Sequence, residues 1–437
     1  MNRRKFLKLA GAAGLGAAAF PLRRGWADTL PPLPPLFPAT DLYPQIQHFV
    51  IIIMENHSFD NVLGTLDRSG VDGLTFVNGA ATNSNPDTSE NPVLAYHLPT
   101  TCQDNFHVSQ NWNSSHLSWN NGANDGFVKV SGKEAMGYYT AADLPIMHAL
   151  GRTFPVCNKW FCSTMCQTYP NRMFTFAGTS QGATATDTNE RIAASAPATG
   201  TIFDHLTANA ISWKNYVVDL GDTMLWGPEY FLTTAVPGHF FPIADFYIDA
   251  AAGTLPAFSV ITPDGFEASE ENPQNVEVGE TFLWSVVTAL FASPAWSKTA
   301  LLITYDEHGG YYDHVPPVSL PAPGDGLLPE QGGMPLPTYG DTFTYSGFRV
   351  PTILVSPWAR ANYVSNTVYD HTSVMKFLEM KYGIPSLTDR DAAANNILDL
   401  FDFDAPSFAS PPLLPPPPLA ESEIACLQNG QTGISTP

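Results

Sequence analysis

The sequence has little positive charge. Its 437 residues include 20 lysines and arginines but 41 aspartates and glutamates, and the formal net charge is −21 at pH 7. Nucleic acids and anionic membrane surfaces repel a chain this acidic, so we expect no nucleic-acid partner. An anionic substrate would need a local positive centre, and a metal ion is the simplest candidate. Acidity that serves only solubility gives the same net charge, so charge alone does not identify the function.

Long apolar runs are absent beyond the N-terminal segment, so we expect no integral membrane segment. Residues 9–20 are apolar and contain small residues, but this run is too short to span a bilayer. Arg3 and Arg4 precede the run and Ala27 follows it, which is typical of a twin-arginine signal peptide over residues 1–27. We therefore expect the mature protein to be periplasmic or secreted. The oligomeric state has no signature in the sequence.

Cysteine is scarce and odd in number: Cys102, Cys157, Cys162, Cys166 and Cys426. In an exported protein we expect one or two disulfides, with the odd cysteine free or paired externally. The spacing of Cys157, Cys162 and Cys166 matches no ferredoxin pattern, which argues against an iron–sulfur centre.

Apolar strand patterns alternate with helical patterns between two proline-rich arms, residues 28–44 and 410–437. The alternation predicts an α/β fold whose mostly parallel sheet is covered by helices on both faces. We find no internal repeat and expect residues 28–437 to form a single catalytic domain. The segments that carry the pattern are the strands 48–54, 298–305 and 350–355 and the helices 281–291 and 372–382.

Oxygen-bearing side chains follow two of the predicted strands. Glu55 and Asn56 come directly after the first strand, and Asp306 and Glu307 come after the strand 298–305. Open α/β sheets bind ligands at the carboxyl ends of their strands, and oxygen ligands suit a hard or borderline divalent cation. A turn that caps the following helix is the alternative for Glu55 and Asn56. We predict one divalent metal ion, which can be calcium, zinc, magnesium or manganese.

Thr168 is the candidate nucleophile. Pro170 is favourable in the first turn of a helix, and residues 171–177 continue the helical pattern. A hydroxyl group at a helix N-terminus lies beside unpaired backbone amides, which suits a phosphoryl group, and coordination to a dication would lower its pKa. The alternative is that Thr168 only caps the helix. Arg172 can clamp phosphate oxygens or pair with an acidic neighbour.

Five motifs, in this order along the chain, resemble the bacterial phosphoesterase family. That family includes phosphatidylcholine-type phospholipases C, acid phosphatases such as that of Francisella, and the plant non-specific phospholipases C. The resemblance runs from about residue 48 to residue 382. Its motifs are Met54–Asp60 with Gly64, the set Trp112, His116, Trp119, Asn120, Gly122 and Asp125–Phe127, then Thr168–Arg172, Asp306–Pro317 and Asp370–Ser373.

The resemblance implies a three-layer α/β/α fold like that of alkaline phosphatase. In similar enzymes the positions of Glu55, Asn56, Asp306 and Glu307, together with the nucleophile hydroxyl, surround one metal ion. The resemblance therefore favours Thr168 as the nucleophile. The expected mechanism is in-line attack of Thr168 on phosphorus, followed by hydrolysis of a phosphothreonine by water.

Four histidines match these motifs, His116, His308, His314 and His371, whereas His57 takes a place that the family usually gives to arginine. His308 and His371 are our candidates for a general acid or a phosphate contact, together with Arg172. His314 is expected to orient Asp306 or Glu307.

Two positions depart from the family pattern. The resemblance implies substrate contacts from Asn171, His116, Gln110 and Asn272, but relatives carry histidine where this chain has Gln110 and Asn272. Glutamine and asparagine can hydrogen-bond phosphate oxygens, but neither carries a proton at neutral pH.

These observations predict an exported, metal-dependent hydrolase of phosphate esters. Thr168, Trp112 and Trp119 favour the phospholipase C type, which cleaves the phosphodiester of a lipid headgroup, and the chain end soon after the motifs favours a non-haemolytic enzyme. The alternatives are an acid phosphatase, a hydrolase of sulfate or phosphonate esters, and a phosphate-ester-binding protein that has lost turnover. The partner is in each case a small-molecule or lipid ester.

Overall fold

The computed structural model describes a compact unit that begins at Thr40. The predicted signal peptide, most of the N-terminal arm and Cys426 lie outside the described residues. Within the described part of the chain, no helix combines the length and apolarity needed to cross a membrane. The structure describes residues 40–103, 107–186, 195–219, 221–235, 238–263, 268–331, 334–335 and 340–418.

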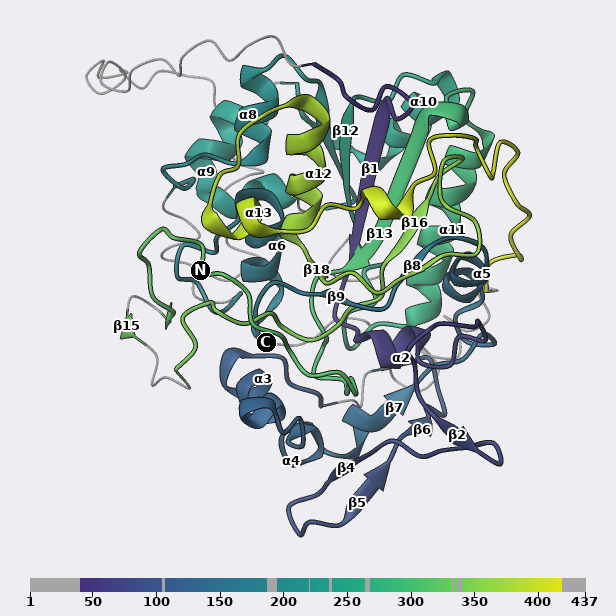
Figure 1. Cartoon of the computed structure of the whole chain (residues 1–437), viewed down its shortest axis with the longest axis vertical. Coiled ribbons are helices and arrows are strands. Elements are labelled where there is room, and N and C mark those ends of the chain that lie inside the picture. The colour runs from purple at the N-terminus through teal and green to yellow at the C-terminus, as the bar shows by residue number, and fades with distance from the viewer. Residues whose placement is uncertain are drawn as a thin grey trace. The chain divides into compact units, whose positions relative to one another are not determined.

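An eight-stranded sheet forms the centre of this unit (Figure 1). Neighbouring strands run parallel, except where β16 pairs with β13 and with β8. The mostly parallel sheet predicted from the sequence is confirmed. Its order is β11 (Phe240–Pro242), β10 (Trp213–Val217), β12 (Phe258–Thr262), β1 (His48–Met54), β13 (Thr299–Tyr305), β16 (Ile353–Val355), β8 (Val156–Cys157) and β17 (Val364–Ser365).

The two central strands β1 and β13 determine where the predicted ligands meet. Both are apolar and almost entirely buried, as expected for strands covered on both faces. Their parallel register runs from His48 opposite Thr299 to Met54 opposite Tyr305. The residues that follow, Glu55 and Asp306, therefore leave the sheet side by side.

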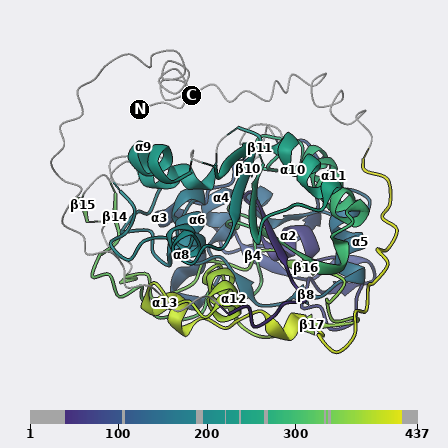
Figure 2. The same cartoon turned by 90° about the horizontal axis from the view of Figure 1, so that it is seen from above.

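Helices cover both faces of the sheet and give three layers (Figures 1 and 2). The helices α6, α8 and α12 lie on one face, and α5, α10 and α11 lie on the other. The α/β three-layer arrangement is therefore confirmed. The bounds are α5 (Pro145–Thr153), α6 (Thr168–Ala177), α8 (Ile202–Ala208), α10 (Ile243–Ala252), α11 (Val276–Ala292) and α12 (Thr372–Tyr382).

Shorter elements surround the carboxyl ends of the strands and the edges of the sheet. The short helices are α2 (Phe59–Leu63), α3 (Trp112–Trp119), α4 (Phe127–Ser131), α9 (Gly227–Tyr230) and α13 (Asp389–Ala393). The two-stranded pairs are β2 (Phe76–Val77) with β3 (Ala80–Ala81), β4 (Ser84–Pro86) with β5 (Pro92–Leu94), β6 (Tyr96–His97) with β7 (Gly137–Tyr138), β9 (Trp160–Phe161) with β18 (Tyr369–Asp370), and β14 (Glu330–Gln331) with β15 (Met334–Pro335).

The described part of the C-terminal arm is less solvated than the sequence predicts. Residues 411–418 contain no helix or strand, but most of them are half-buried. The carbonyl of Pro418 accepts a hydrogen bond from the Thr281 hydroxyl on α11 at 3.5 Å. This part of the arm therefore packs on the helical layer.

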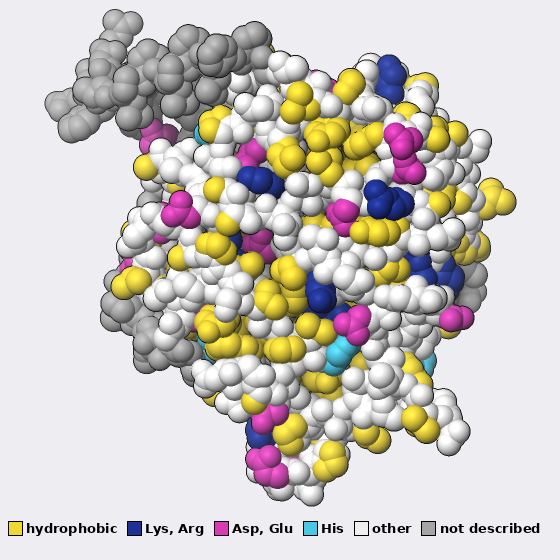
Figure 3. Space-filling view, viewed as in Figure 1, with side chains coloured by type: hydrophobic (Ala, Val, Ile, Leu, Met, Phe, Trp, Pro, Cys, Tyr) yellow, Lys and Arg dark blue, Asp and Glu magenta, His cyan; other side chains and the backbone are white. Residues whose placement is uncertain are grey.

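Charged side chains are sparse on the face of the molecule shown in Figure 3, and the lysines and arginines there are scattered among uncharged residues. That face offers no concentrated positive field to an anionic partner.

Of the four cysteines among the described residues, Cys102 is disulfide-bonded, in agreement with the prediction. Cys157, Cys162 and Cys166 are free and buried. Burial raises the pKa of each of the three thiols, so they remain protonated and unreactive.

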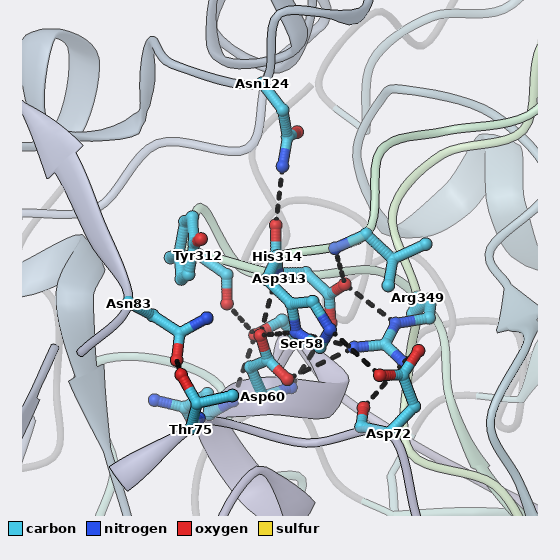
Figure 4. A network of polar contacts seen from close by, with 12 residues as sticks. Ser58, Asp60, Asp72, Thr75, Asn83, Asn124, Tyr312, Asp313, His314 and Arg349 are labelled. Atoms are coloured by element: carbon cyan, nitrogen blue, oxygen red, sulfur yellow. Dashed lines mark hydrogen bonds and ion pairs between the residues drawn. The ribbon is translucent and has the colours of Figure 1, made fainter. Parts of the chain in front are cut away.

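A buried ion cluster joins the segments that follow β1 and β13 (Figure 4). Arg349 donates from Nε to Asp313 Oδ1 at 2.7 Å and from Nη2 to Asp60 Oδ1 at 3.1 Å. His314 Nδ1 lies 2.7 Å from Asp60 Oδ2, and its Nε2 lies 3.2 Å from Asp72 Oδ1. The expectation that His314 orients Asp306 or Glu307 is thus wrong, because its partners are two other carboxylates.

The cluster makes stability depend on pH. Burial alone would lower the pKa of His314, but the hydrogen bond and the charge of Asp60, with the charge of Asp313, raise it to about 9. A base with a raised pKa stabilises the fold below its unfolded pKa of about 6.5, and that stabilisation is lost as pH rises toward 9.

We predict that the melting temperature falls as pH rises from about 6.5 to 9, and that His314→Gln flattens this dependence. Calorimetric melting across this range measures the effect. His97→Gln is the matched control, because His97 makes an exposed pair with Asp143, and it should keep the wild-type slope. An unchanged slope in His314→Gln contradicts the prediction.

Candidate active site

The loops after β1 and β13 pack tightly against each other. Asn56 has a left-handed backbone with φ of 67°, and its amide donates to Asp306 Oδ1 at 3.1 Å. Gly309 also has a positive φ, and a Cβ there would lie 1.8 Å from the Asn56 carbonyl oxygen. Only glycine fits at that position. This close packing holds the two predicted ligand pairs together, although they are about 250 positions apart in sequence.

Thr168 reaches the same place from a third element. It is the first residue of α6, and the N-cap is Gln167, so capping is not the role of Thr168. Its hydroxyl donates to Asn56 Oδ1 at 3.3 Å, and its proximity favours the charged form of the Asp306 carboxylate. The capping alternative for Glu55 and Asn56 fails as well, because Ser58 caps α2. The structure therefore brings the candidate nucleophile onto the predicted metal ligands.

Asn171, predicted as a substrate contact, braces the turn that carries Thr168. Its Oδ1 accepts from the Thr164 amide at 3.0 Å, and its Nδ2 donates to the carbonyls of Thr164 and Cys166 at 3.1 and 3.0 Å. The side chain is fully buried with these bonds. A substrate contact from Asn171 stays a prediction, and the observed role is to shape the turn.

Arg172 pairs with acidic neighbours, which is one of its two predicted roles. Its Nε donates to Asp306 Oδ2 at 3.4 Å, its Nη1 to Asp222 Oδ1 at 3.0 Å, and its Nη2 to Glu55 Oε1 at 3.2 Å and to the Ile53 carbonyl at 3.1 Å. Burial lowers the pKa of Arg172, but Asp222, Asp306 and Glu55 together raise it above its ordinary value. The guanidinium is therefore charged and holds the predicted metal ligands in place.

Carboxyl groups outnumber basic groups around Thr168. Glu55 and Asp306 share the guanidinium of Arg172, the carboxyl of Glu307 lies beside that of Asp306, and the carboxyl of Glu271 adds a hydrogen bond to Glu55. Burial raises the pKa of Glu55, Asp306 and Glu307, and neighbouring carboxylates raise those of Glu55 and Glu307 further. The local excess of negative charge is therefore costly unless another cation compensates it.

The donor set fits a divalent cation. Carboxylate, amide and hydroxyl oxygens converge here, and these are the ligands of hard divalent ions. Glu307 Oε1 is buried without a hydrogen-bond partner among the described residues, so its lone pairs are available for a ligand bond. The residues predicted to hold the ion thus provide both negative charge and a carboxylate oxygen that can bind the ion.

A second acidic group is geometrically tighter but electrically balanced. The ligand atoms of Asp60, Asp313 and His314 lie within 4.8 Å of one another, whereas Glu55, Asp306 and Glu307 form no such tight group among the described residues. Arg349 already bridges Asp60 and Asp313. A dication there would displace or repel this guanidinium, so the site beside Thr168 is the better candidate.

His308 and His371 are both buried and neutral. Burial lowers the pKa of His371 to about 4 and that of His308 to about 3. His371 donates from Nε2 to the Asp306 carbonyl at 2.7 Å and accepts at Nδ1 from Trp160 at 3.2 Å. Both ring nitrogens of His371 are thus engaged, and its Nε2 holds the backbone carbonyl of Asp306. The predicted proton transfer by either histidine stays a prediction.

The ring of His308 packs against the aromatic rings of Phe127 and Phe348. Within the part of the chain that the structure describes, neither nitrogen of His308 has a hydrogen-bond partner, although Nδ1 lies 3.2 Å from Glu307 Oε2. His308 is thus adjacent to the candidate ligands and able to make a new polar contact.

The remaining predicted substrate contacts differ in whether their hydrogen-bonding atoms already have partners. His116 is buried between two acceptors, the Trp112 carbonyl at 2.7 Å and Asp341 Oδ2 at 3.1 Å. Asn272 Oδ1 accepts from the Tyr311 hydroxyl at 3.2 Å, and its buried Nδ2 has no partner in the described segments. The Nδ2 of Asn272 is thus a donor available to a ligand.

Gln110 follows Ser109, whose backbone packs against Gly310 next to the acidic loop. Trp112 and Trp119 are buried in two core clusters, so neither is exposed to a headgroup.

Asp222 and Glu271 were not predicted. Asp222 begins the 3₁₀ helix Asp222–Trp226, lies in none of the five motifs and meets Arg172 only through the fold. Glu271 directly precedes Asn272, a position where the chain departs from the family pattern, and this neighbour was the available signal.

A family model named the phosphoesterase family matches residues 46–385. Phospholipase C B of Mycobacterium tuberculosis is 32% identical, over 86% of this chain and 81% of that protein. Non-specific phospholipase C1 of Arabidopsis thaliana is 31% identical, over 85% of this chain and 74% of that protein. A solved protein of the alkaline phosphatase superfamily from Vibrio parahaemolyticus is 9% identical with a TM-score of 0.41, over 90% of this chain and 79% of that chain, which is too distant to inform the site.

The matched region contains all five motifs, both strand ends and the Thr168 turn. The resemblance inferred from the motifs is confirmed by this match. The chain belongs to the phosphoesterase family and is a hydrolase that acts on phosphoric ester bonds.

Proposed function

We propose that the protein is an exported, metal-dependent phosphoesterase of the phospholipase C type, with Thr168 as its nucleophile. The observation that carries the proposal is the convergence of the Thr168 hydroxyl with Asn56 and Asp306 at two adjacent strand ends. A hydroxyl at the first residue of a helix, beside a carboxylate that can take its proton, is suited to attack on phosphorus.

The proposed reaction has two displacements. Thr168 Oγ1 bonds to phosphorus as the bond to the leaving oxygen breaks, and the hydroxyl proton passes to the adjacent Asp306 carboxylate, which returns it to the leaving oxygen to give the alcohol. Water then attacks the phosphothreonine, the bond from phosphorus to Thr168 Oγ1 breaks, and one proton of the water passes to Thr168 as the phosphate or phosphomonoester is released. Arg172 keeps Glu55 and Asp306 in place throughout, because its donors already bind them.

Glu55, Asn56, Asp306, Glu307 and Thr168 would hold the divalent ion. Bound there, it would lower the pKa of the Thr168 hydroxyl and offset negative charge on the phosphoryl oxygens. The Nδ2 atom of Asn272, buried and without a partner, is a further donor for a phosphoryl oxygen.

The proposal of a phospholipase C type rests on the two relatives described above, which are named as phospholipases C. An acid phosphatase remains the alternative, and turnover of p-nitrophenylphosphorylcholine against p-nitrophenyl phosphate decides between them. Preference for the diester supports the phospholipase type, and preference for the monoester overturns it. No release from either ester by metal-loaded protein would support the impaired, ester-binding alternative raised by Gln110 and Asn272.

We predict that Thr168→Ala lowers kcat on the preferred ester by at least about a thousandfold, because removal of a covalent nucleophile has effects of this order or larger. A stopped assay of p-nitrophenol release measures it. Thr175→Ala is the matched control: Thr175 lies in the same helix and its hydroxyl donates to the Asn171 carbonyl at 3.1 Å, so near-native turnover is expected. Native turnover by Thr168→Ala would exclude the nucleophile assignment.

We predict that chelation abolishes turnover and lowers the melting temperature, and that adding back a divalent ion restores both. The physical reason is the repulsion among Glu55, Asp306 and Glu307, which one guanidinium does not balance. Metal analysis and calorimetric titration identify the ion, and Glu307→Gln should weaken its binding by about tenfold or more. Asp60→Asn leaves the affinity for the ion unchanged if the ion binds beside Thr168. Full turnover by metal-free protein contradicts the proposal.

Export by the twin-arginine route is part of the same proposal. We predict that replacing Arg3 and Arg4 together by lysine keeps the protein in the cytoplasm, because the route reads the arginine pair. Cell fractionation with an antibody measures the distribution, and replacing Arg23 and Arg24 by lysine is the matched control. Equal export of the two variants would show that another route is used.

A further inference from the structure

A line of buried polar side chains crosses four adjacent strand ends and finishes on Arg172. It starts at Asn215 on β10 and continues to Thr262, the last residue of β12. Asp222 then joins Thr262 to Arg172, which reaches Glu55 after β1 and Asp306 after β13. These strands are consecutive neighbours in the sheet, so the line runs across the sheet toward the carboxyl ends of β1 and β13.

The hydrogen bonds along the line converge on Asp222, whose carboxylate accepts from both sides. Asn215 Nδ2 donates to Thr262 Oγ1 at 3.0 Å, and the Thr262 hydroxyl donates to Asp222 Oδ2 at 2.7 Å. The other carboxylate oxygen, Oδ1, accepts from Arg172 Nη1 at 3.0 Å. Both oxygens of Asp222 are therefore used, and the carboxylate links the β12 end to the guanidinium.

The backbone around Asp222 is built to approach Asn215 closely. A Cβ on Gly221 would lie 2.5 Å from Asn215 Oδ1 and 2.6 Å from the Phe240 ring, so a side chain there would push the segment away. Thr223 donates from its hydroxyl to Asn215 Oδ1 at 3.2 Å. Asn215, Asp222 and Thr223 are all buried, so the geometry of the link is rigid.

We propose that Asp222 is a positioning residue that fixes the Arg172 guanidinium between Glu55 and Asp306. The inference rests on the proposed catalytic role of the Thr168 site. Arg172 uses its Nε and Nη2 on the acidic residues of that site and its Nη1 on Asp222, so Asp222 determines the rotation of the planar guanidinium. Asp222 touches none of the reacting atoms and acts only through Arg172.

Asp222→Asn tests the proposal, because it keeps the shape but removes an acceptor and the charge. If the amide oxygen faces Arg172, its Nδ2 faces Thr262, whose hydroxyl then has no acceptor. We expect kcat to fall about 10- to 100-fold with KM changed by less than about threefold, since a small misplacement of the catalytic geometry has this effect on turnover. A crystal structure should show the guanidinium moved from Glu55 or Asp306.

Asp391→Asn is the matched control. Asp391 is equally buried and accepts from the Thr388 and Leu387 amides at the start of α13, away from Thr168. It should lower the melting temperature without changing kcat. If Asp222 has a merely structural role, Asp222→Asn will behave like this control, with a lower melting temperature and an unchanged kcat.

Thr262 supplies a second test if Asp222→Asn does not fold. Thr262→Val removes the donor to Asp222 and should lower kcat about 3- to 10-fold, and Thr262→Ser should restore it to within about twofold, because the hydroxyl is the relevant group. Native kcat in both Asp222→Asn and Thr262→Val overturns the proposal, as does a variant structure in which Arg172 keeps both acidic contacts. If the wild type releases no product, the proposed function fails, but the variant structure still decides the role of Asp222.

Discussion

The parallel pairing of β1 with β13 is the constraint on which the site depends. Its register ends at Met54 and Tyr305, so Glu55 and Asp306 emerge at the same level from two adjacent buried strands. Like charges that the sheet brings together in a buried position must be compensated, since burial disfavours each of them. The sheet therefore creates a demand for positive charge at this edge, and Arg172 meets only part of that demand.

Two buried arginines serve the same strand ends in different ways. Arg349 pairs with Asp60 and Asp313, and the negative charges of these two residues are balanced by its guanidinium and by His314. Arg172 lies within the site, where further carboxyl groups remain uncompensated. The outer cluster is thus electrically complete and joins the loops, whereas the inner one has charge left for a cation. This difference in charge balance, rather than the spacing of the ligands, is the reason for proposing that an ion binds beside Thr168.

Sequence patterns predicted the parts that depend on local order. Apolar runs gave β1 and β13, and the position of oxygen-bearing residues directly after them gave the meeting of Asn56 with Asp306. What the patterns did not give are contacts chosen by tertiary packing. Nothing near Asp222 in sequence points to Arg172, and the partner of His314 depends on where Asp60 falls in α2. Side chains that bond distant backbone or charges carry no periodic signature.

The histidines show how a motif residue can act by geometry. His371 belongs to a family motif, which suggested proton transfer, yet both ring nitrogens are engaged and burial lowers its pKa to about 4. Its Nε2 bond to the Asp306 carbonyl fixes the backbone of a residue whose side chain faces Thr168. Asn171 acts similarly on the turn that carries Thr168, through the Thr164 and Cys166 carbonyls. A neutral imidazole and a buried amide therefore hold the Asp306 backbone and the turn that carries Thr168, because each uses its hydrogen bonds on groups outside its own backbone.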